Sequence, residues 1–230
     1  MTEAQYDAER TRFRDRADAG RKLAALLQHL KDKDPVVLAL PRGGVAIGRE
    51  VARRLGAPLD IVLVRKIGVP WQPELALGAV SDGAEPQIFI DERLQQNLAI
   101  PQDFVRDETA RQLTELERRR RVYCADRPPS AVADRTAIVV DDGIATGATM
   151  RVALRAVRHR GPAHLVLAAP VAAVETLEEL SGEADETVCV EPVTGLGAIG
   201  FYYADFHQMT DDEVTDLLAR APAPQVPPPP

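Results

Sequence analysis

The segment that most constrains the fold lies at residues 137–149, where an apolar run is followed by two acids and a turn rich in glycine and threonine. Residues 137–140 are too apolar for a solvated edge, so they predict a buried strand of a parallel sheet. Asp141 and Asp142 follow directly, and open α/β sheets bind ligands at the carboxyl ends of their strands. The segment therefore predicts an α/β fold with a ligand site at this acid pair.

The turn after the two acids is suited to binding an anion. Gly143 and Gly147 leave backbone N–H groups accessible, and Thr146 and Thr149 add hydroxyls. The N-terminus of a following helix favours a phosphate through its unpaired donors and its dipole. These residue types also serve simply to end a strand and cap a helix. Two adjacent acids fit that alternative less well, because like charges repel and burial of a charge is costly.

A second strand with a glycine-containing turn lies upstream. Residues 36–40 predict a buried strand, which ends before Arg42, Gly43 and Gly44 and the helical pattern of residues 45–55. A guanidinium beside two glycines allows a fixed cation and backbone N–H groups to approach a diphosphate together. The alternative for Arg42 is a solvated residue at the rim of the sheet.

A third predicted strand, residues 60–64, precedes two cations, Arg65 and Lys66, which can neutralise the same diphosphate. Residues 67–75 contain two prolines and a glycine, so they predict a loop through which neither helix nor strand runs. Trp71 in this loop either caps a bound ligand or packs the loop against the domain.

Together these motifs resemble the type I phosphoribosyltransferases, and within them a bacterial subgroup known as predicted phosphoribosyltransferases. The resemblance rests on the acidic run with residues 41–44, 65–68 and 74–79, and it covers roughly residues 10–218. One departure is Gly143, since the position after the two acids is usually aliphatic. The resemblance implies a doubly wound, mainly parallel sheet with a small hood and a helical insertion.

The resemblance also implies a role for each motif in binding phosphoribosyl pyrophosphate (PRPP). Asp141 and Asp142 would hold the ribose hydroxyls, and residues 67–75 would form a mobile lid that excludes water from a reactive sugar cation. Mg²⁺ would be held mainly through PRPP near the two acids, with no direct protein ligand. The residues expected to contact substrate are Arg42, Gly43, Gly44, Asp141, Asp142, Ala145, Thr146, Gly147, Ala148 and Thr149. The residues expected to act in catalysis are Arg65, Lys66, Asp141 and Asp142.

The implied activity is Mg²⁺-dependent transfer of ribosyl 5-phosphate from PRPP to a nitrogenous base or related acceptor, with release of pyrophosphate, within nucleotide metabolism. The sequence does not specify the acceptor. One alternative is a non-catalytic regulator that binds PRPP or a nucleotide and signals through helix 103–121 or an oligomer interface. Another is a phosphorylase or phosphohydrolase that acts on a ribose phosphate.

The expected organisation is one phosphoribosyltransferase-like domain over residues 1–220. It includes a helical insertion at about 82–130 and a hood at about 190–210, and a proline-rich disordered tail follows at 221–230. Further elements predicted from periodicity are a helix over 10–30, a helix over 174–180, and strands over 87–90, 164–169 and 186–190.

Residues 195–200 spell G-x-G-x-x-G, the pattern of a dinucleotide-binding turn. That motif requires a following helix and an acid roughly twenty residues later. Aromatic residues follow instead, and position 220 is an arginine, so a nicotinamide-dependent oxidoreductase is not expected. The aromatic residues of the predicted hood either stack on a planar ring or form the hood's own core; they are Phe201, Tyr202, Tyr203 and Phe206.

Composition limits the partners. The net charge is −7, which disfavours a general nucleic-acid binder. The run of arginines at 118–121 ends a predicted charged helix, so we interpret it as surface ion pairs that complement the helix dipole. Cys124 and Cys189 lack metal-site spacing, which fits thiols in a reducing compartment. No apolar stretch reaches the length of a membrane span, and residues 1–5 lack the start of a secretion signal. We therefore expect a cytoplasmic protein without membrane partners, for which a homodimer is possible.

Overall fold

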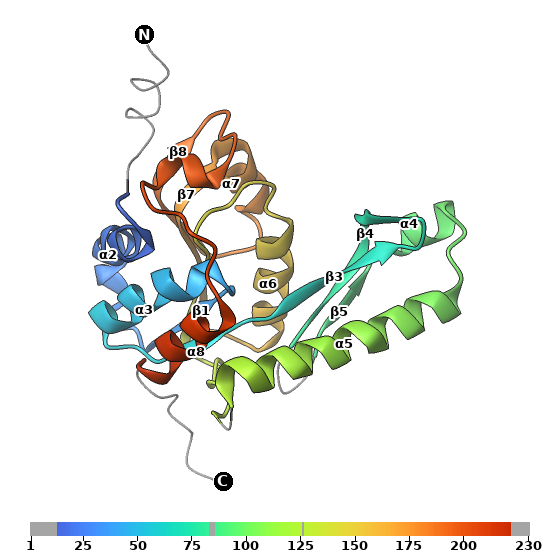
Figure 1. Cartoon of the computed structure of the whole chain (residues 1–230), viewed down its shortest axis with the longest axis horizontal. Coiled ribbons are helices and arrows are strands. Elements are labelled where there is room, and N and C mark those ends of the chain that lie inside the picture. Colours follow the sequence, from blue (N-terminus) through green and yellow to red (C-terminus); the bar gives the residue numbers. More distant parts are fainter. Residues whose placement is uncertain (1–12, 83–85, 126, 222–230) are drawn as a thin grey trace.

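A five-stranded parallel sheet forms the centre of the computed structural model, which describes residues 13–82, 86–125 and 127–221 (Figure 1). The strand order is β2-β1-β6-β7-β8. The strands are β1 (Pro35–Ala39), β2 (Leu59–Ile61), β6 (Thr136–Val140), β7 (His164–Ala173) and β8 (Glu186–Val193). Every residue of β1 and of β6 is buried, as the apolar runs predict for inner parallel strands.

Successive side chains of β1 enter two different apolar clusters, one on each face of the sheet. Val37 and Ala39 belong to the cluster formed with α2 (Arg16–Leu26), α3 (Gly43–Leu55) and α8 (Asp211–Ala219). Val36 and Leu38 belong to the cluster formed with α6 (Ala148–His159) and α7 (Val174–Leu180). Alternating strand residues point to opposite faces, so helices cover both. The predicted doubly wound α/β class is confirmed.

An antiparallel unit, which we call the arm, extends to one side of the parallel sheet (Figure 1). Its sheet has the order β3-β4-β5, and α5 lies along it. The arm consists of β3 (Val64–Val69), β4 (Gln72–Ser81), β5 (Ile88–Ile90), α4 (Glu92–Asn97) and α5 (Gln102–Cys124). It corresponds to the predicted lid and insertion together.

The prediction of an irregular loop at residues 67–75 is wrong, because β3 and β4 run through most of this segment. The chain reverses at Pro70 and Trp71, and Val69 pairs with Gln72 across the turn. Pro73 lies where the pairing is irregular, since the next paired residue of β4 is Ala76. A proline cannot donate to the ladder, but a bulge removes the need for that donor.

Other elements also differ in extent from the prediction, including β7 and β8, which extend beyond the predicted strands. The strand expected at 60–64 is divided: β2 ends at Ile61, and Val64 begins β3 in the arm. The helix expected at 10–30 is α2, followed by a 3₁₀ turn at Gln28–Leu30. Residues 1–12 and the predicted tail at 222–230 lie outside the described residues. Among the described helices, none combines the length and the apolar character that crossing a membrane requires.

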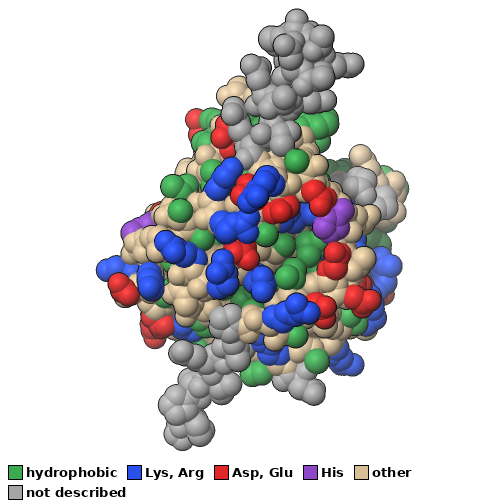
Figure 2. Space-filling view, turned by 60° about the vertical axis from the view of Figure 1, so that its left-hand side comes forward, with side chains coloured by type: hydrophobic (Ala, Val, Ile, Leu, Met, Phe, Trp, Pro, Cys, Tyr) green, Lys and Arg blue, Asp and Glu red, His purple; other side chains and the backbone are tan. Residues whose placement is uncertain are grey.

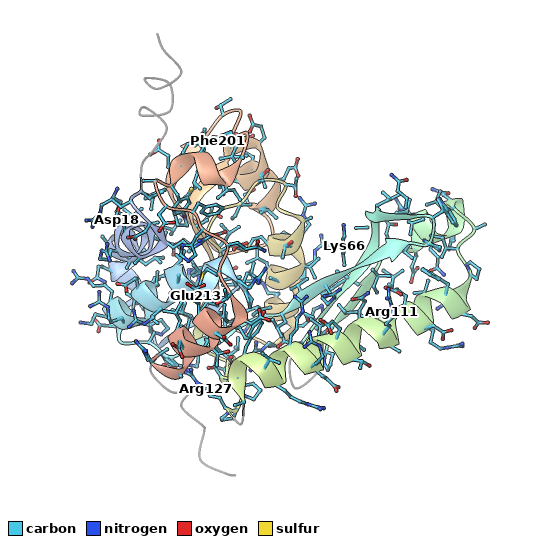
Figure 3. The ribbon with its side chains drawn as sticks, viewed as in Figure 1. Asp18, Lys66, Arg111, Arg127, Phe201 and Glu213 are labelled. Atoms are coloured by element: carbon cyan, nitrogen blue, oxygen red, sulfur yellow. The ribbon has the colours of Figure 1, made fainter. Side chains whose placement is uncertain are left out.

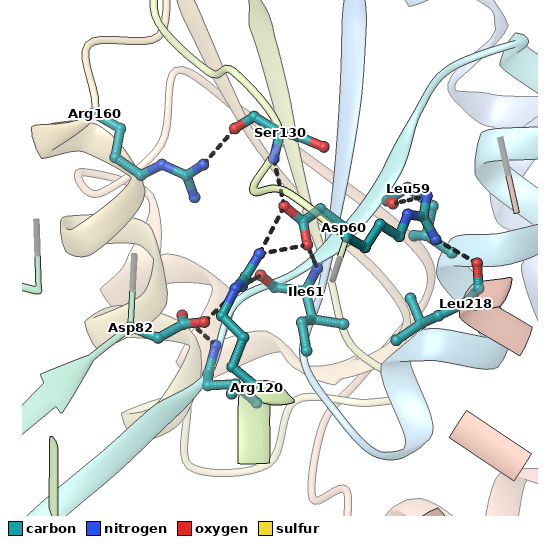
Figure 4. Close-up of polar contacts among 10 residues, drawn as sticks. Leu59, Asp60, Ile61, Asp82, Arg120, Ser130, Arg160 and Leu218 are labelled. Atoms are coloured by element: carbon teal, nitrogen blue, oxygen red, sulfur yellow. Dashed lines mark hydrogen bonds and ion pairs between the residues drawn. The ribbon is translucent and has the colours of Figure 1, made fainter. Parts of the chain in front are cut away.

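A polar junction joins the arm to the parallel sheet (Figure 4). Arg120 of α5 donates to Asp60 of β2 at 3.1 Å and to Asp82 after β4 at 2.7 Å. Asp60 also accepts the backbone N–H of Ser130 at 2.6 Å, and Arg160 donates to the Ser130 carbonyl at 2.7 Å. The base of the arm is therefore fixed by a connected set of charges.

The structure confirms the surface-pair interpretation of the 118–121 run for three of its four arginines. Arg118 and Arg119 pair with Glu115, and Arg121 pairs with Glu117. Arg120 is different, since its side chain is only 18% exposed and bridges two buried acids in the junction. Its helical position turns it toward the sheet while its neighbours face solvent.

Candidate functional site

A cavity of about 240 Å³ lies at the carboxyl end of β6. Its walls are the acid pair, the turn that follows, the start of α6 and one residue from the segment after β8. The lining residues are Asp141, Asp142, Gly143, Ile144, Ala145, Thr146, Gly147, Ala148, Thr149, Met150 and Ile199. The structure therefore brings the predicted acid pair and the predicted phosphate loop together in one cavity.

The turn from residue 143 to 147 is anchored to β7 and α7. Ile144 donates its N–H to the Val171 carbonyl at 2.9 Å, and Thr176 donates its hydroxyl to the Ala145 carbonyl at 2.6 Å. Gly147 precedes α6 with a φ of 70°, and a Cβ at this position would lie 2.6 Å from Thr176 Cγ2. The first N–H groups of α6 have no acceptor within the helix, so this rigid turn presents donors for a phosphate.

The glycine pair upstream lies directly against the acid pair. A Cβ on Gly43 would be 1.8 Å from Asp142 Oδ2, and one on Gly44 would be 2.7 Å from the Val140 carbonyl. The peptide bond between Pro41 and Arg42 is cis. Only glycine allows these two loops to approach so closely. The side chain of Arg42 lies near α8, with its Nη1 3.8 Å from Asp211.

The two acids are held in a defined arrangement. Asp142 donates its backbone N–H to Asp141 Oδ1 at 2.8 Å, and Asp142 Oδ2 accepts from Arg16 Nε at 2.8 Å. The hydroxyl of Tyr203 donates to the Asp142 carbonyl at 2.6 Å. Desolvation and the nearby Asp142 carboxylate raise the pKa of Asp141 well above its ordinary value. The two carboxyl groups therefore lie next to each other beside the phosphate loop.

Sequence analysis did not identify Arg16 as a site residue. A signal was present, because Arg16 falls at helical spacing with Ala19, Gly20 and Leu23 on the buried stripe of α2. A charged residue on such a stripe requires a buried partner, and that partner, Asp142, is distant in sequence.

Two of the hood aromatics stack on each other. Tyr202 and Tyr203 are buried, and the ring of Phe206 stacks on Tyr203 with centroids 4.9 Å apart. Phe201 is exposed and is the one member of the set whose ring faces solvent to about half of its area. A 3₁₀ turn at Ile199–Tyr202, rather than an α-helix, follows the glycines of residues 195–200. This geometry lacks the helix that a dinucleotide-binding turn requires.

The two predicted leaving-group cations lie on opposite faces of β3. Arg65 donates to Gln112 of α5 at 2.5 Å and lines a separate cavity of about 670 Å³ beside that helix. Lys66 lies on the side of the strand that faces α6 (Figure 3). Adjacent strand residues point in opposite directions, so the two side chains cannot converge on one group here. The structure therefore does not bring Arg65 to the acid pair, and the catalytic role of Lys66 stays a prediction.

Within the described ranges, no group of three or more His, Cys, Asp or Glu side chains is arranged to hold a metal ion. Asp141 and Asp142 are the carboxyl groups that line the cavity with the phosphate loop. They can interact with a hard cation that brings further ligands of its own, such as phosphate oxygens and water.

Comparison with known proteins places this site in a family. The family model described as "Phosphoribosyl transferase domain" matches residues 12–204, which include the sheet, the cavity and the arm. The chain therefore belongs to the phosphoribosyl transferase family, the class that the parallel sheet and its acidic loop indicate.

Individual relatives agree with this assignment. A Mycobacterium tuberculosis protein, found in two strains and named provisionally as a phosphoribosyl transferase, is 43% identical over 210 residues. This match covers 91% of the present chain but 47% of the relative, so the chain spans about half of the relative's length. The crystal structure of TT1426 from Thermus thermophilus is 45% identical, with a TM-score of 0.80. That match covers 90% of this chain and 98% of the Thermus chain.

Proposed function

We propose that this protein transfers ribosyl 5-phosphate from PRPP to a nitrogenous base or related acceptor and releases pyrophosphate. The observation that carries the proposal is the position of Asp141 and Asp142, which lie between the start of α6 and the Gly43-Gly44 turn. These three groups match the three parts of PRPP. The acids suit the ribose hydroxyls, the helix start suits the 5-phosphate, and the glycine turn suits the pyrophosphate.

The proposed chemistry depends mainly on positioning and charge. The bond from the anomeric carbon to pyrophosphate breaks, pyrophosphate leaves with the electron pair, and positive charge develops on the ribose ring. The acceptor nitrogen then bonds to that carbon and releases its proton to solvent. Asp141 and Asp142 orient the ring through its hydroxyls, and the fixed donors at the start of α6 hold the 5-phosphate. Binding at both ends keeps the ring in place while the central bond is exchanged.

We further propose that Mg²⁺ accompanies PRPP in this site. The acid pair supports this proposal because the two carboxyl groups are adjacent, and the Arg16 guanidinium forms its ion pair with Asp142. A bound Mg²⁺ would supply charge neutralisation to the departing pyrophosphate. We place it on oxygens of PRPP near Asp141 and Asp142, with water completing its shell.

A second candidate function is a regulator that binds PRPP or a nucleotide without transferring the sugar. One observation favours it: Arg65 bonds to α5, away from the acid pair, so the cations expected to steady a leaving group are not gathered at the cavity. A transferase needs the arm to bring a cation such as Lys66 to the pyrophosphate. A regulator does not need the arm to move in this way.

Calorimetric titration with PRPP, with and without Mg²⁺, tests the donor site, and Asp142→Asn is the diagnostic variant. We expect binding that Mg²⁺ strengthens and that the substitution weakens about tenfold. No heat under either condition would contradict the proposal for PRPP.

Pyrophosphate release with a panel of bases then separates the functions. Release that depends on one base supports the transferase, whereas tight binding without release supports the regulator. Transfer to phosphate or to water would instead indicate the phosphorylase or phosphohydrolase activity considered from the sequence.

A further inference from the structure

Arg16 is the buried cation that contacts the proposed sugar site from outside the motifs discussed above. Its side chain is 10% exposed, and its Nε donates to Asp142 Oδ2 at 2.8 Å. Its Nη1 donates to the His207 carbonyl at 2.8 Å, and its guanidinium lies 4.0 Å from the centre of the Phe206 ring. Three different groups therefore fix the guanidinium in one orientation.

These contacts determine which way the Asp142 carboxylate faces. Oδ2 accepts from Arg16 Nε, and a Cβ on Gly43 would lie 1.8 Å from the same oxygen. The backbone of Asp142 is held at its carbonyl by Tyr203 and at its N–H by Asp141. Arg16, Tyr203 and Asp141 therefore fix one carboxylate oxygen and the backbone of Asp142, a residue that lines the cavity.

We propose that Arg16 is a positioning residue for the acid pair: it holds Asp142 so that one carboxylate oxygen is presented to the ribose hydroxyls of PRPP. The inference rests on the proposed function, because it names the residue that prepares the same sugar site. Arg16 does not contact the sugar. It acts through the Asp142 carboxylate, which is the group proposed to contact the sugar.

The contacts explain why an arginine is needed at this position. The guanidinium donates in two directions from one plane while its face covers Phe206, and a lysine has neither the fork nor the flat face. Phe206 in turn stacks on Tyr203, whose hydroxyl reaches the Asp142 carbonyl. Each residue in the series Arg16, Phe206, Tyr203 and Asp142 therefore contacts the next, and Asp142 contacts Arg16 again. These contacts connect the hood to the acid pair.

Arg16 also offsets part of the charge in the site. The pKa of Asp141 is raised by desolvation and by Asp142, and the positive charge of Arg16 lowers it. Buried Tyr203 is another titratable side chain packed here, and burial raises its pKa. Figure 2 shows acidic and basic side chains interspersed on one face of the molecule. Arg16 also lines a cavity of about 470 Å³. Its guanidinium is therefore a specific source of positive charge beside the acid pair.

The test compares Arg16→Gln and Arg16→Lys with the control Arg21→Gln. Arg21 is on the same helix, but its ion pair with Asp18 is exposed, at 3.5 Å. We expect Arg16→Gln to weaken PRPP binding, measured by calorimetry with Mg²⁺, about tenfold, because a charge-assisted hydrogen bond orienting the carboxylate is lost. Arg16→Lys should recover part of the affinity, and Arg21→Gln should bind as wild type.

Kinetics and a ligand-free measurement separate positioning from a general structural role. If the transferase reaction is found, Arg16→Gln should raise KM for PRPP about tenfold and change kcat less than about threefold, since the oriented carboxylate acts on the bound sugar in ground and transition states alike. In the free protein, the carbon-13 resonance of the Asp142 carboxyl should move in Arg16→Gln and stay in place in Arg21→Gln.

Two results would overturn the proposal. One is a lower melting temperature in Arg16→Gln with unchanged PRPP affinity; the other is an unmoved Asp142 carboxyl resonance. If wild type does not bind PRPP, the proposed function fails. The carboxyl resonance still decides whether Arg16 controls Asp142, because it is measured without ligand.

Discussion

Ile199 packs directly onto Gly143, so closely that a Cβ on Gly143 would lie 2.5 Å from Ile199 Cγ2. Both residues line the 240 Å³ cavity. The sequence departure at Gly143, where related signatures usually have an aliphatic residue, is thus matched by an aliphatic side chain that enters from the hood.

This contact predicts that a smaller residue at position 199 compensates for a larger residue at position 143. Gly143→Val should lower the free energy of unfolding by about 1–3 kcal/mol, because the added side chain forces Ile199 to move. Gly143→Val with Ile199→Ala should recover much of that loss, since the smaller residue makes room. Urea unfolding of the single and double variants measures the coupling. Strictly additive effects would show that the two side chains do not compete for one space.

The two glycines of the upstream turn should respond differently to alanine. Gly44→Ala should destabilise the protein by about 1–3 kcal/mol, because its Cβ would meet the fixed Val140 carbonyl at 2.7 Å. Gly43→Ala should instead weaken PRPP binding more than tenfold, because its Cβ displaces the Asp142 carboxylate.

Gly182→Ala provides the control for both variants, since a Cβ there meets nothing within 4 Å. Thermal unfolding and PRPP calorimetry on all three variants make the comparison. Equal loss of stability in Gly43→Ala and Gly44→Ala, with equal affinity, would contradict the distinction.

Arg120→Met should destabilise the base of the arm. The substitution leaves Asp60 and Asp82 buried without their cation, at a cost of about 3 kcal/mol. Hydrogen exchange should increase first in β3, β4 and the end of α5. Arg118→Met, which removes an exposed pair with Glu115, should leave the free energy of unfolding nearly unchanged. Similar losses of unfolding free energy in the two variants would show that the buried ion pairs of the junction stabilise the protein no more than an exposed pair does.

Asp141→Asn should stabilise the protein at neutral pH. The folded-state pKa of Asp141 is raised above its ordinary value of 3.8, so its ionisation is more costly in the folded than in the unfolded chain. The resulting loss of stability develops as pH rises from 3.8 through the folded-state pKa. Asparagine removes this cost while keeping an oxygen acceptor for the Asp142 N–H.

The gain in Asp141→Asn should therefore be present at pH 7 and disappear at acid pH, where wild-type Asp141 is protonated in both states. Melting curves across pH measure it, at roughly 2–4 °C for each kcal/mol in a chain of this length. Asp103→Asn, at an exposed position of α5, is the control. A gain that persists unchanged below pH 3.8 would contradict the electrostatic explanation.

The parallel part of the fold follows from local patterns. Residues 36–40 and 137–140 are continuous apolar runs, and they form β1 and β6, two of the three inner strands of the parallel sheet. The acid pair and the anion loop are also predictable, because both follow a strand and precede a helix within one short segment. Such features depend on neighbours in sequence, so the sequence alone locates them.

Features that depend on distant segments were not predictable. Two prolines at 70 and 73 indicate a break in regular structure, yet a turn and a bulge place them within a hairpin. The opposite directions of Arg65 and Lys66 follow only once residues 64–69 are known to be a strand. The link from Arg16 to Asp142 spans 126 residues, and no local pattern specifies such a contact.

Trp71 lies in the turn between β3 and β4, and its side chain is 62% exposed. It is the single tryptophan of the chain. Tryptophan emission therefore originates from the end of the arm alone, without background from the parallel sheet or the hood. The protein thus carries an intrinsic fluorophore at one defined point. A ligand that moves this hairpin into a less hydrated environment will change the wavelength and intensity of the Trp71 emission, so its binding can be followed without an added label.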